Sequence, residues 1–214
     1  MADRRFYHQK NVKNTLKLLQ IVVHKLNEHN IAYYLDFGTL IGAIRDKGLI
    51  PWDDDIDISL VNESDYHKME QVLDEIKKEY KLRTYLFTFI SSYEKRKKRK
   101  REIFVPNVSF TKSTNYQIAK VRDNKFWIFG RGNSCIDIFF KYKFNNRSYW
   151  MAYGKENSVP LEYISDELIT IDFLGIKCTI PKEYDKYLTY KYGNWKIPNK
   201  NWSHDQDDYS IINP

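Results

Sequence analysis

The chain has 214 residues, 42% of them hydrophobic and 16% aromatic, so it can bury a core and is not expected to be disordered. Its formal net charge is +7, and the run 95–101 alone supplies seven positive charges, which leaves the rest close to neutral. This distribution argues against a generally basic protein that coats nucleic acid. The only two cysteines, Cys135 and Cys178, exclude a disulfide framework and a four-cysteine zinc site.

Targeting signals are absent from the sequence as given. Residues 1–14 contain no apolar signal core, and no stretch is long and apolar enough to span a bilayer. We therefore expect a cytoplasmic protein. Because there is no internal repeat and no clear linker, we predict a single domain over residues 1–214, with a basic loop at 94–102 and a polar tail from about residue 194.

The first third of the chain alternates helical and extended patterns. Apolar residues at three- and four-residue spacing predict an amphipathic helix over residues 10–29, followed by a strand over 32–35. A glycine turn, a short helical segment and a loop ending at Pro51 lead into a strand over 55–60. Ser64 or Asp65 is expected to cap the next helix, whose apolar side consists of Tyr66, Met69, Val72, Leu73 and Ile76.

The remaining chain is richer in predicted strands, at residues 82–90, 103–110, 116–121 and 135–140. Alternating apolar residues over 168–180 predict a hairpin that turns at Leu174 and Gly175. A helix is expected to begin at Pro181 and to stop at Gly193, and the tail beyond it to be poorly ordered at its end. These elements predict an α+β fold with a mixed sheet flanked by helices.

Four carboxylates are concentrated within residues 53–57, where like charges repel unless a cation binds them. Side chains alternate faces along a strand, so Asp53, Asp55 and Asp57 are expected to point one way and Asp54 the other. Carboxylate oxygens are ligands for hard cations such as Mg²⁺. A calcium-binding EF-hand loop is excluded, because Ile58 and Ser64 stand where it needs glycine and glutamate.

Two other stretches complete the predicted site. Asp137 is a single acid inside an apolar strand, and an ionised side chain is costly to bury without a partner, so we expect it to face the same cation as Asp55 and Asp57. At Gly38 and Thr39 a strand end turns into a short helix, where free backbone amides can meet an anion. A metal site beside a phosphate site indicates phosphoryl or nucleotidyl chemistry.

Four segments together resemble the signature of the LicD family. They are the run GTLIGAIRDKGLIPWDDDIDISL at 38–60, the segment Lys120 to Asp123, the acid strand at 136–139 and the stretch from Ile180 to Gly193. This family includes the fukutin and fukutin-related proteins. The resemblance implies a nucleotidyltransferase-like fold that binds Mg²⁺, or Mn²⁺ in its place. It further implies transfer of a phospho-alcohol, such as phosphocholine or phosphoribitol, from a CDP-activated donor to a hydroxyl of a glycan or glycolipid, with release of CMP.

Site roles follow from the same resemblance. It assigns Asp55, Asp57 and Asp137 to the metal, and Gly38 and Thr39 to the donor phosphates. Arg45, Lys120 and Arg122 are candidates to pair with those phosphates, with surface salt bridges as the alternative. Asp53 is expected to be a further metal ligand, a general base for the acceptor hydroxyl or an orienting group. Asp36 is expected to cap or orient the helix after it, and His204 is treated as incidental.

Alternatives stay open for the activity and for the basic run. A nucleotidyltransferase that acts on a nucleotide or nucleic acid is the rival enzyme, and a non-catalytic binding module is the rival outside enzymes. The run 95–101 is interpreted first as a solvated loop, then as a contact for an anionic acceptor or a membrane surface, and last as a nucleic-acid contact. Few aromatic residues interrupt this run, so it does not indicate a stacking platform for single strands.

Overall fold

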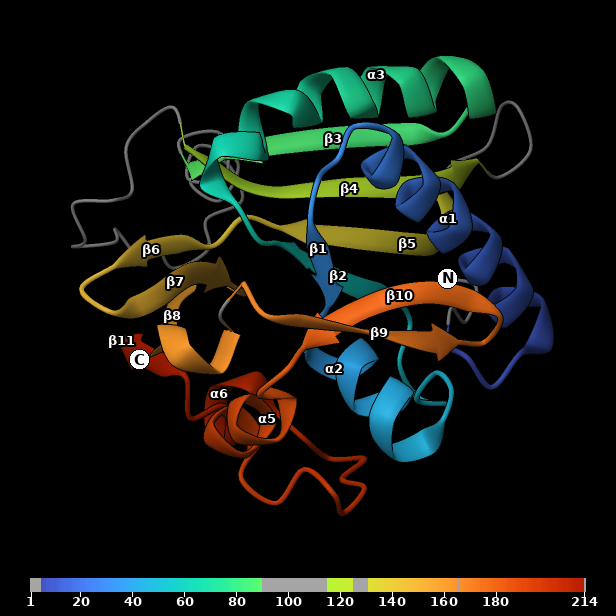
Figure 1. Cartoon of the computed structure of the whole chain (residues 1–214). Coiled ribbons are helices and arrows are strands. Elements are labelled where there is room, and N and C mark those ends of the chain that lie inside the picture. The colour runs from blue at the N-terminus through green and yellow to red at the C-terminus, as the bar shows by residue number, and fades with distance from the viewer. Residues whose placement is uncertain (1–4, 90–114, 125–130, 165, 214) are drawn as a thin grey trace, which may run out of the picture.

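A computed structural model describes residues 5–89, 115–124, 131–164 and 166–213 (Figure 1). The basic loop at 94–102 and the strand predicted at 103–110 lie outside these ranges. Within them, no helix combines the length and the apolar character that crossing a membrane requires.

The centre of the fold is a five-stranded sheet with the order β1-β2-β5-β4-β3. Strands β2 and β5 are parallel and the other neighbouring strands are antiparallel, so the sheet is mixed as predicted. Every strand predicted from the sequence within the described part of this sheet is present. Their bounds are β1 Tyr33–Leu35, β2 Ile56–Leu60, β3 Arg83–Thr88, β4 Tyr116–Asn124 and β5 Arg131–Phe139.

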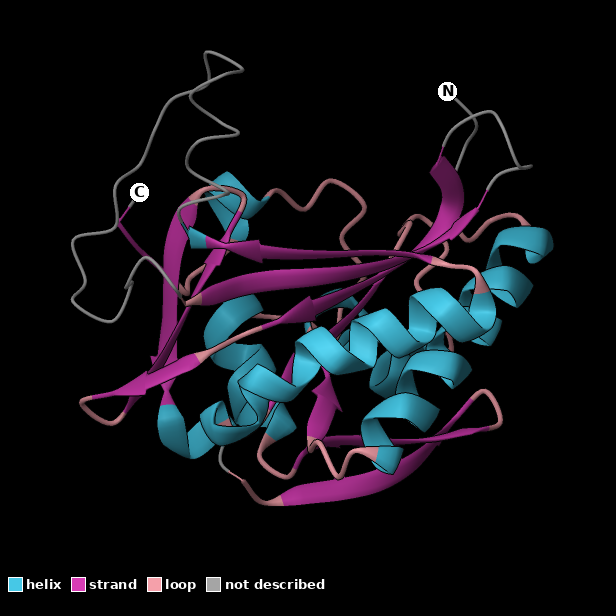
Figure 2. Cartoon of the chain, turned by 90° about the horizontal axis from the view of Figure 1, so that it is seen from above, coloured by secondary structure: helices cyan, strands magenta, loops and turns pink. Residues whose placement is uncertain are grey.

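Two helices, α1 (Gln9–Glu28) and α3 (Met69–Tyr80), pack against this sheet and against each other (Figure 2). Four isoleucines of β2 and β5, at positions 56, 58, 136 and 138, have no exposed surface. Because side chains alternate along a strand, Asp57 and Asp137 lie on the opposite face of the sheet from these isoleucines. Packing of apolar residues on one face thus leaves the two acids together on the other.

The start of α3 differs from the prediction. The five apolar residues expected on its inner side are all buried, which confirms the helical face. Ser64 and Asp65, however, lie inside a 3₁₀-helix, Glu63–Lys68, so neither caps α3. The Asp65 carboxylate is 2.7 Å from the Lys68 ammonium, and this contact engages it in place of a capping bond to a backbone amide.

A second sheet, four-stranded and antiparallel, has the order β11-β8-β7-β6. It was missed in the sequence, although its first two hairpin turns carry residues with positive φ: Asn145 and Asn146 at 47° and 58°, and Tyr153 and Gly154 at 49° and 91°. Positive φ at both turn positions is the geometry of a tight hairpin turn. The strands are β6 Tyr142–Phe144, β7 Arg147–Ala152, β8 Lys155–Pro160 and β11 Ile211–Asn213. A 3₁₀-helix, Leu161–Ile164, follows β8.

The predicted hairpin is confirmed as β9 (Leu168–Phe173) and β10 (Ile176–Pro181), which turn at Leu174 and Gly175 with φ of 53° and 85°. The predicted helix follows as α5 (Tyr184–Tyr192) and ends at Gly193, whose φ is 62°. Its predicted start at Pro181 is wrong, because Pro181 pairs with Leu168 as the last residue of β10. Proline is tolerated at the edge of a sheet, where its missing N–H is not needed.

The tail beyond α5 is also more ordered than predicted. It contains a short helix, α6 (His204–Asp207), and β11, which adds an edge to β8. Backbone hydrogen bonds join Tyr209 N to Lys191 O and Ser158 N to Ser210 O at 3.0 and 2.8 Å. The tail is therefore integrated into the fold beside α5 (Figure 1).

Candidate active site

Three of the predicted metal ligands converge from two strands. Asp57 and Asp137 occupy paired positions on the parallel strands β2 and β5, and Asp55 directly precedes β2. One carboxylate oxygen from each of the three lies within 4.8 Å of the other two. The register of the sheet thus brings Asp137 to Asp55 and Asp57, as expected. The three oxygens form a donor set of the kind that hard cations prefer.

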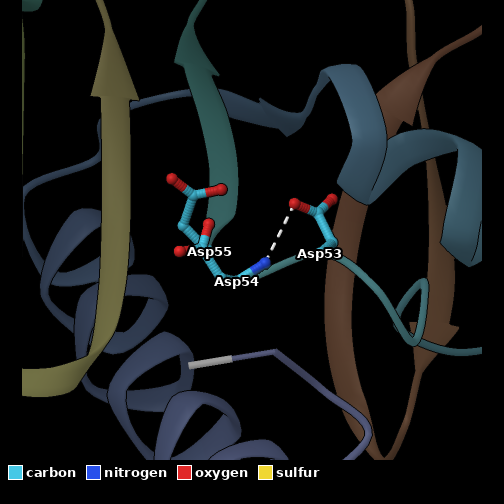
Figure 3. A group of neighbouring side chains, drawn as sticks. All are labelled: Asp53, Asp54 and Asp55. Atoms are coloured by element: carbon cyan, nitrogen blue, oxygen red, sulfur yellow. Dashed lines mark hydrogen bonds between the residues drawn. The ribbon is translucent and has the colours of Figure 1, made fainter. Parts of the chain in front are cut away.

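Asp53 and Asp54 extend this group along the chain. Oxygens of Asp53, Asp54 and Asp55 also lie within 4.8 Å of one another, and Asp53 Oδ1 accepts a hydrogen bond from the Asp54 amide at 3.0 Å (Figure 3). Strand alternation does not reach residue 54, because β2 begins only at Ile56, but Asp54 does not line the cavity that Asp53, Asp55 and Asp57 line. We refer to Asp53, Asp55, Asp57 and Asp137 as the acidic cluster.

Burial and mutual repulsion both act on these carboxyls. Burial raises the pKa of Asp53 to about 6. The pKa values of Asp55 and Asp57 are raised well above the usual range, first by burial and then by the neighbouring carboxylates. A divalent cation would remove this repulsion and favour the charged forms, so the chemistry of the donor set fits Mg²⁺ or Mn²⁺.

Lys120 is a positively charged residue that contacts the acidic cluster. It stands opposite Asp137 in the β4–β5 register, and its ammonium contacts the Asp137 carboxylate. Burial lowers the pKa of Lys120, but the charge of Asp137, the hydrogen bond to it and the nearby Cys135 and Asp55 together outweigh burial, so the net change is upward. The other Asp137 oxygen accepts from the Cys135 thiol at 2.9 Å. Lys120 therefore lies beside the acidic cluster, and its predicted contact with donor phosphates stays a prediction.

Gly38 and Thr39 have roles in positioning the acids. Thr39 Oγ1 accepts a hydrogen bond from the Asp57 amide at 2.9 Å. A Cβ atom built at Gly38 would lie 2.6 Å from Asp53 Oδ2, so glycine leaves room for that carboxylate. The first amide of α2 (Phe37–Ile41), which continues as a π-helical turn Gly42–Asp46, already donates to Asp36 Oδ1 at 2.7 Å. Contact of this turn with a phosphate stays a prediction.

Asp36 caps α2, as expected, and also anchors a buried polar network that the sequence did not indicate. Its carboxylate is 2.6 Å from Lys141 Nζ and accepts from Ser59 Oγ and Tyr187 OH at 2.5 and 2.6 Å. Burial lowers the pKa of Lys141 to about 8 against the opposing effect of Asp36. The Lys141 ammonium lies 4.3–5.3 Å from the ring centres of Tyr34, Phe37, Trp150 and Tyr187, where cation–π attraction adds to the ion pair.

The two predicted arginines differ in position. Arg45 lines the cavity over the acidic cluster, but its guanidinium donates to Asp46 at 2.8 Å and to the Trp195 carbonyl at 3.0 Å. Arg122 stands opposite Cys135 and is not among the residues that line the cavity. One of its terminal nitrogens is buried without a hydrogen-bond partner among the described residues. The structure therefore brings Arg45 to the site and leaves Arg122 outside it.

A cavity of about 1070 Å³ opens over the acidic cluster. The sheet supplies one wall, with the acids and Lys120. The opposite wall comes largely from the segment after α5, and it also contains His204, which the sequence analysis had set aside. Aromatic side chains dominate this second wall and the rim: Trp52, Tyr153, Tyr192, Trp195, Trp202 and Tyr209.

Comparison with known protein families adds to this geometry. Residues 30–183 match the family model described as "LicD/FKTN/FKRP, nucleotidyltransferase domain". The chain belongs to this family. The matched range contains every member of the acidic cluster, and it ends before α5 and the segment that forms the opposite wall of the cavity.

Individual relatives agree with the family match. The chain is 34% identical over 207 residues to an uncharacterized protein of Rickettsia prowazekii (strain Madrid E), covering 94% of this chain and 59% of that one. It is 23% identical to the human ribitol-5-phosphate transferase FKTN, covering 89% and 35%. Over 36 residues it is 67% identical to the lipopolysaccharide cholinephosphotransferase LicD of Haemophilus influenzae, covering 16% and 14%. The chain thus spans less than two thirds of the length of these relatives.

Proposed function

We propose that the protein is a metal-dependent transferase that moves a phospho-alcohol from a CDP-activated donor to a hydroxyl of a glycan or glycolipid, releasing CMP. The observation that carries the proposal is the convergence of Asp55, Asp57 and Asp137 in a cavity that also contains Lys120. The relatives named as a ribitol-5-phosphate transferase and a lipopolysaccharide cholinephosphotransferase support the class of group transferred.

The proposed roles follow from the contacts. Asp55, Asp57 and Asp137 would hold Mg²⁺, which when bound neutralises charge on the donor diphosphate. Lys120, now paired with Asp137, is placed to contact a donor phosphate oxygen, and Arg45 at the cavity wall can add a second contact. Thr39 fixes the backbone of Asp57, and Gly38 leaves space for Asp53. The chain therefore contributes mainly positioning and electrostatics.

The rival enzyme is a nucleotidyltransferase that acts on a nucleotide or a nucleic acid. The same acids serve both reactions, because each breaks a phosphoanhydride bond beside a metal. The difference lies in which phosphorus the acceptor attacks. A binding module without activity is disfavoured by the complete set of acids, because carboxylates gathered in one cavity repel one another unless a cation binds them.

A donor screen tests the proposal. The purified protein is incubated with Mg²⁺ and CDP-choline, CDP-ribitol, CDP-glycerol, CTP or ATP, and the nucleotide products are separated. Release of CMP from a CDP-alcohol, lost with EDTA and in Asp137→Asn, supports the proposal. Transfer of the nucleotide from CTP or ATP to an added RNA or nucleotide supports the rival enzyme. Binding of Mg²⁺ without turnover of any donor supports the binding module.

A further inference from the structure

A second group of ionisable side chains lines the same cavity as the acidic cluster. Lys191, His204 and Asp208 all line the cavity, and all three lie beyond the range that matches the family model. The Asp208 carboxylate is fully buried, and its Oδ2 atom is 2.5 Å from Lys191 Nζ and 3.4 Å from His204 Nε2. Asp208 therefore links a buried ammonium to an imidazole at the cavity wall.

His204 lacks the hydrogen bonds that a buried histidine normally makes. Its side chain is only 9% exposed, and neither ring nitrogen has a hydrogen-bond partner in the described part of the chain. The contact with Asp208 is close enough for charge attraction but does not have hydrogen-bond geometry. An unpaired buried polar group destabilises the folded state. A group that enters the cavity and pairs with the imidazole would recover this free energy.

Tyr153 places His204 relative to the acidic cluster. The Tyr153 ring is centred 4.8 Å from the His204 ring, and 82% of Tyr153 is exposed, at the cavity. Tyr153 therefore lies beside His204 in the cavity that the acidic cluster also lines.

We propose that His204 is the base that accepts the proton of the attacking hydroxyl, with Asp208 as the residue that positions it. This inference rests on the proposed function. The acceptor O–H bond breaks and its proton moves to the unprotonated ring nitrogen of His204. The oxygen forms a bond to the phosphorus that carries the alcohol, and the bond from that phosphorus to the bridging oxygen breaks, so its electron pair leaves with CMP. The imidazolium is stabilised by Asp208.

The charged groups around His204 agree with this role. Burial has the largest effect on the pKa of His204 and lowers it. The carboxylates of Asp208 and of Asp205 in α6 raise this pKa, and the ammonium groups of Lys191 in α5 and Lys155 in β8 lower it. The Tyr153 phenol on β7–β8 is the remaining ionisable group in contact. The imidazole is therefore neutral at neutral pH and has a free lone pair for a proton. Asp53, with a pKa of about 6, is the competing base, so a pH profile alone does not separate the two.

Chemical rescue separates them. CMP release from CDP-choline and CDP-ribitol is measured with Mg²⁺, using water alone or added glycerol as acceptor, for wild type, His204→Ala and the control His24→Ala, whose side chain is 59% exposed on α1. We expect kcat of His204→Ala to fall about 100-fold or more, with little change in donor KM. Added imidazole should restore turnover in proportion to its neutral form, and His24→Ala should behave as wild type.

Other outcomes contradict the inference in distinguishable ways. Turnover of His204→Ala at the wild-type rate removes His204 from the reaction and leaves the proposed function intact. A loss that imidazole does not restore, in a variant with an unchanged thermal midpoint, assigns His204 a role in binding or positioning and overturns the base. If His204→Ala does not fold, His204→Asn, which keeps a polar side chain, takes its place: lost turnover with little change in donor KM supports the base, and wild-type turnover overturns it. Inactive wild type contradicts the proposed function and this inference together.

Discussion

The two walls of the cavity are specified by the chain in different ways. The wall with the acidic cluster comes from β2 and β5, where short apolar strands carry acids at fixed spacing. The opposite wall comes from residues 194–209, which have no periodic pattern and are ordered by distant contacts such as Lys191 with Asp208 and Ser158 with Ser210. Acids that are positioned by strand alternation can be predicted from the residues around them in the sequence. The position of a segment held by buried ion pairs depends on the whole fold and cannot be predicted in this way.

The largest expected effect concerns the sheet wall. Asp137→Asn and Asp55→Asn should each reduce Mg²⁺-dependent CMP release by about 1000-fold or more, because each removes a charged ligand of the proposed metal. Asp74→Asn on α3, 54% exposed, is the matched control and should retain activity. Unchanged turnover in either site variant would remove that residue from the mechanism.

The opposite wall is tested by stability. Asp208→Asn should lower the free energy of unfolding by about 3–5 kcal/mol, because it leaves the Lys191 ammonium buried without its carboxylate. Asp205→Asn is the control, since Asp205 is 69% exposed, and should cost less than about 1 kcal/mol. Urea unfolding measures both. Equal small effects would show that the segment after α5 is not part of the packed fold.

The acidic cluster should also make stability depend on pH. The folded pKa of Asp53, about 6, lies above the unfolded value of about 4, so the folded state binds the proton more tightly. Its contribution is present below about pH 4 and is lost as the pH rises through about 6, by at most about 3 kcal/mol. Without metal, Asp53→Asn should therefore gain stability relative to wild type between about pH 4 and pH 7. Urea unfolding at both pH values checks this, and a constant difference would contradict it.

A smaller effect is expected where the chain only positions an acid. Thr39→Val removes the acceptor of the Asp57 amide and should cost about 1–3 kcal/mol of stability and about tenfold in kcat. Thr39→Ser keeps the hydroxyl and should recover most of both. If the two variants behave alike, the hydrogen bond does not position Asp57.

Sequence patterns predicted most of the central sheet, its two helices, the β9–β10 hairpin and the convergence of Asp55, Asp57 and Asp137. These features depend on short-range periodicity and on the cost of a lone buried charge. The strands of residues 142–160 were missed, although the residues at 145–146 and 153–154 carried a turn signal.

Other features gave no local signal. Asp36 was assigned only to its helix, because its partners Lys141 and Tyr187 lie more than a hundred residues away. Pro181 was placed in a helix because its pairing with β9 is not visible in its neighbours. His204 was set aside for the same reason: its position on the cavity wall follows from the Lys191 and Asp208 pair, which only the folded chain reveals.

The central claim is that acids from two strands bind one divalent cation. Titration calorimetry with Mg²⁺ at about pH 8, where the carboxyls are more readily ionised, tests it most directly. We predict saturable binding to wild type that is lost in Asp57→Asn and Asp137→Asn and kept in Asp74→Asn. Saturable binding of equal strength in Asp57→Asn and Asp137→Asn, or none in wild type, would contradict the account.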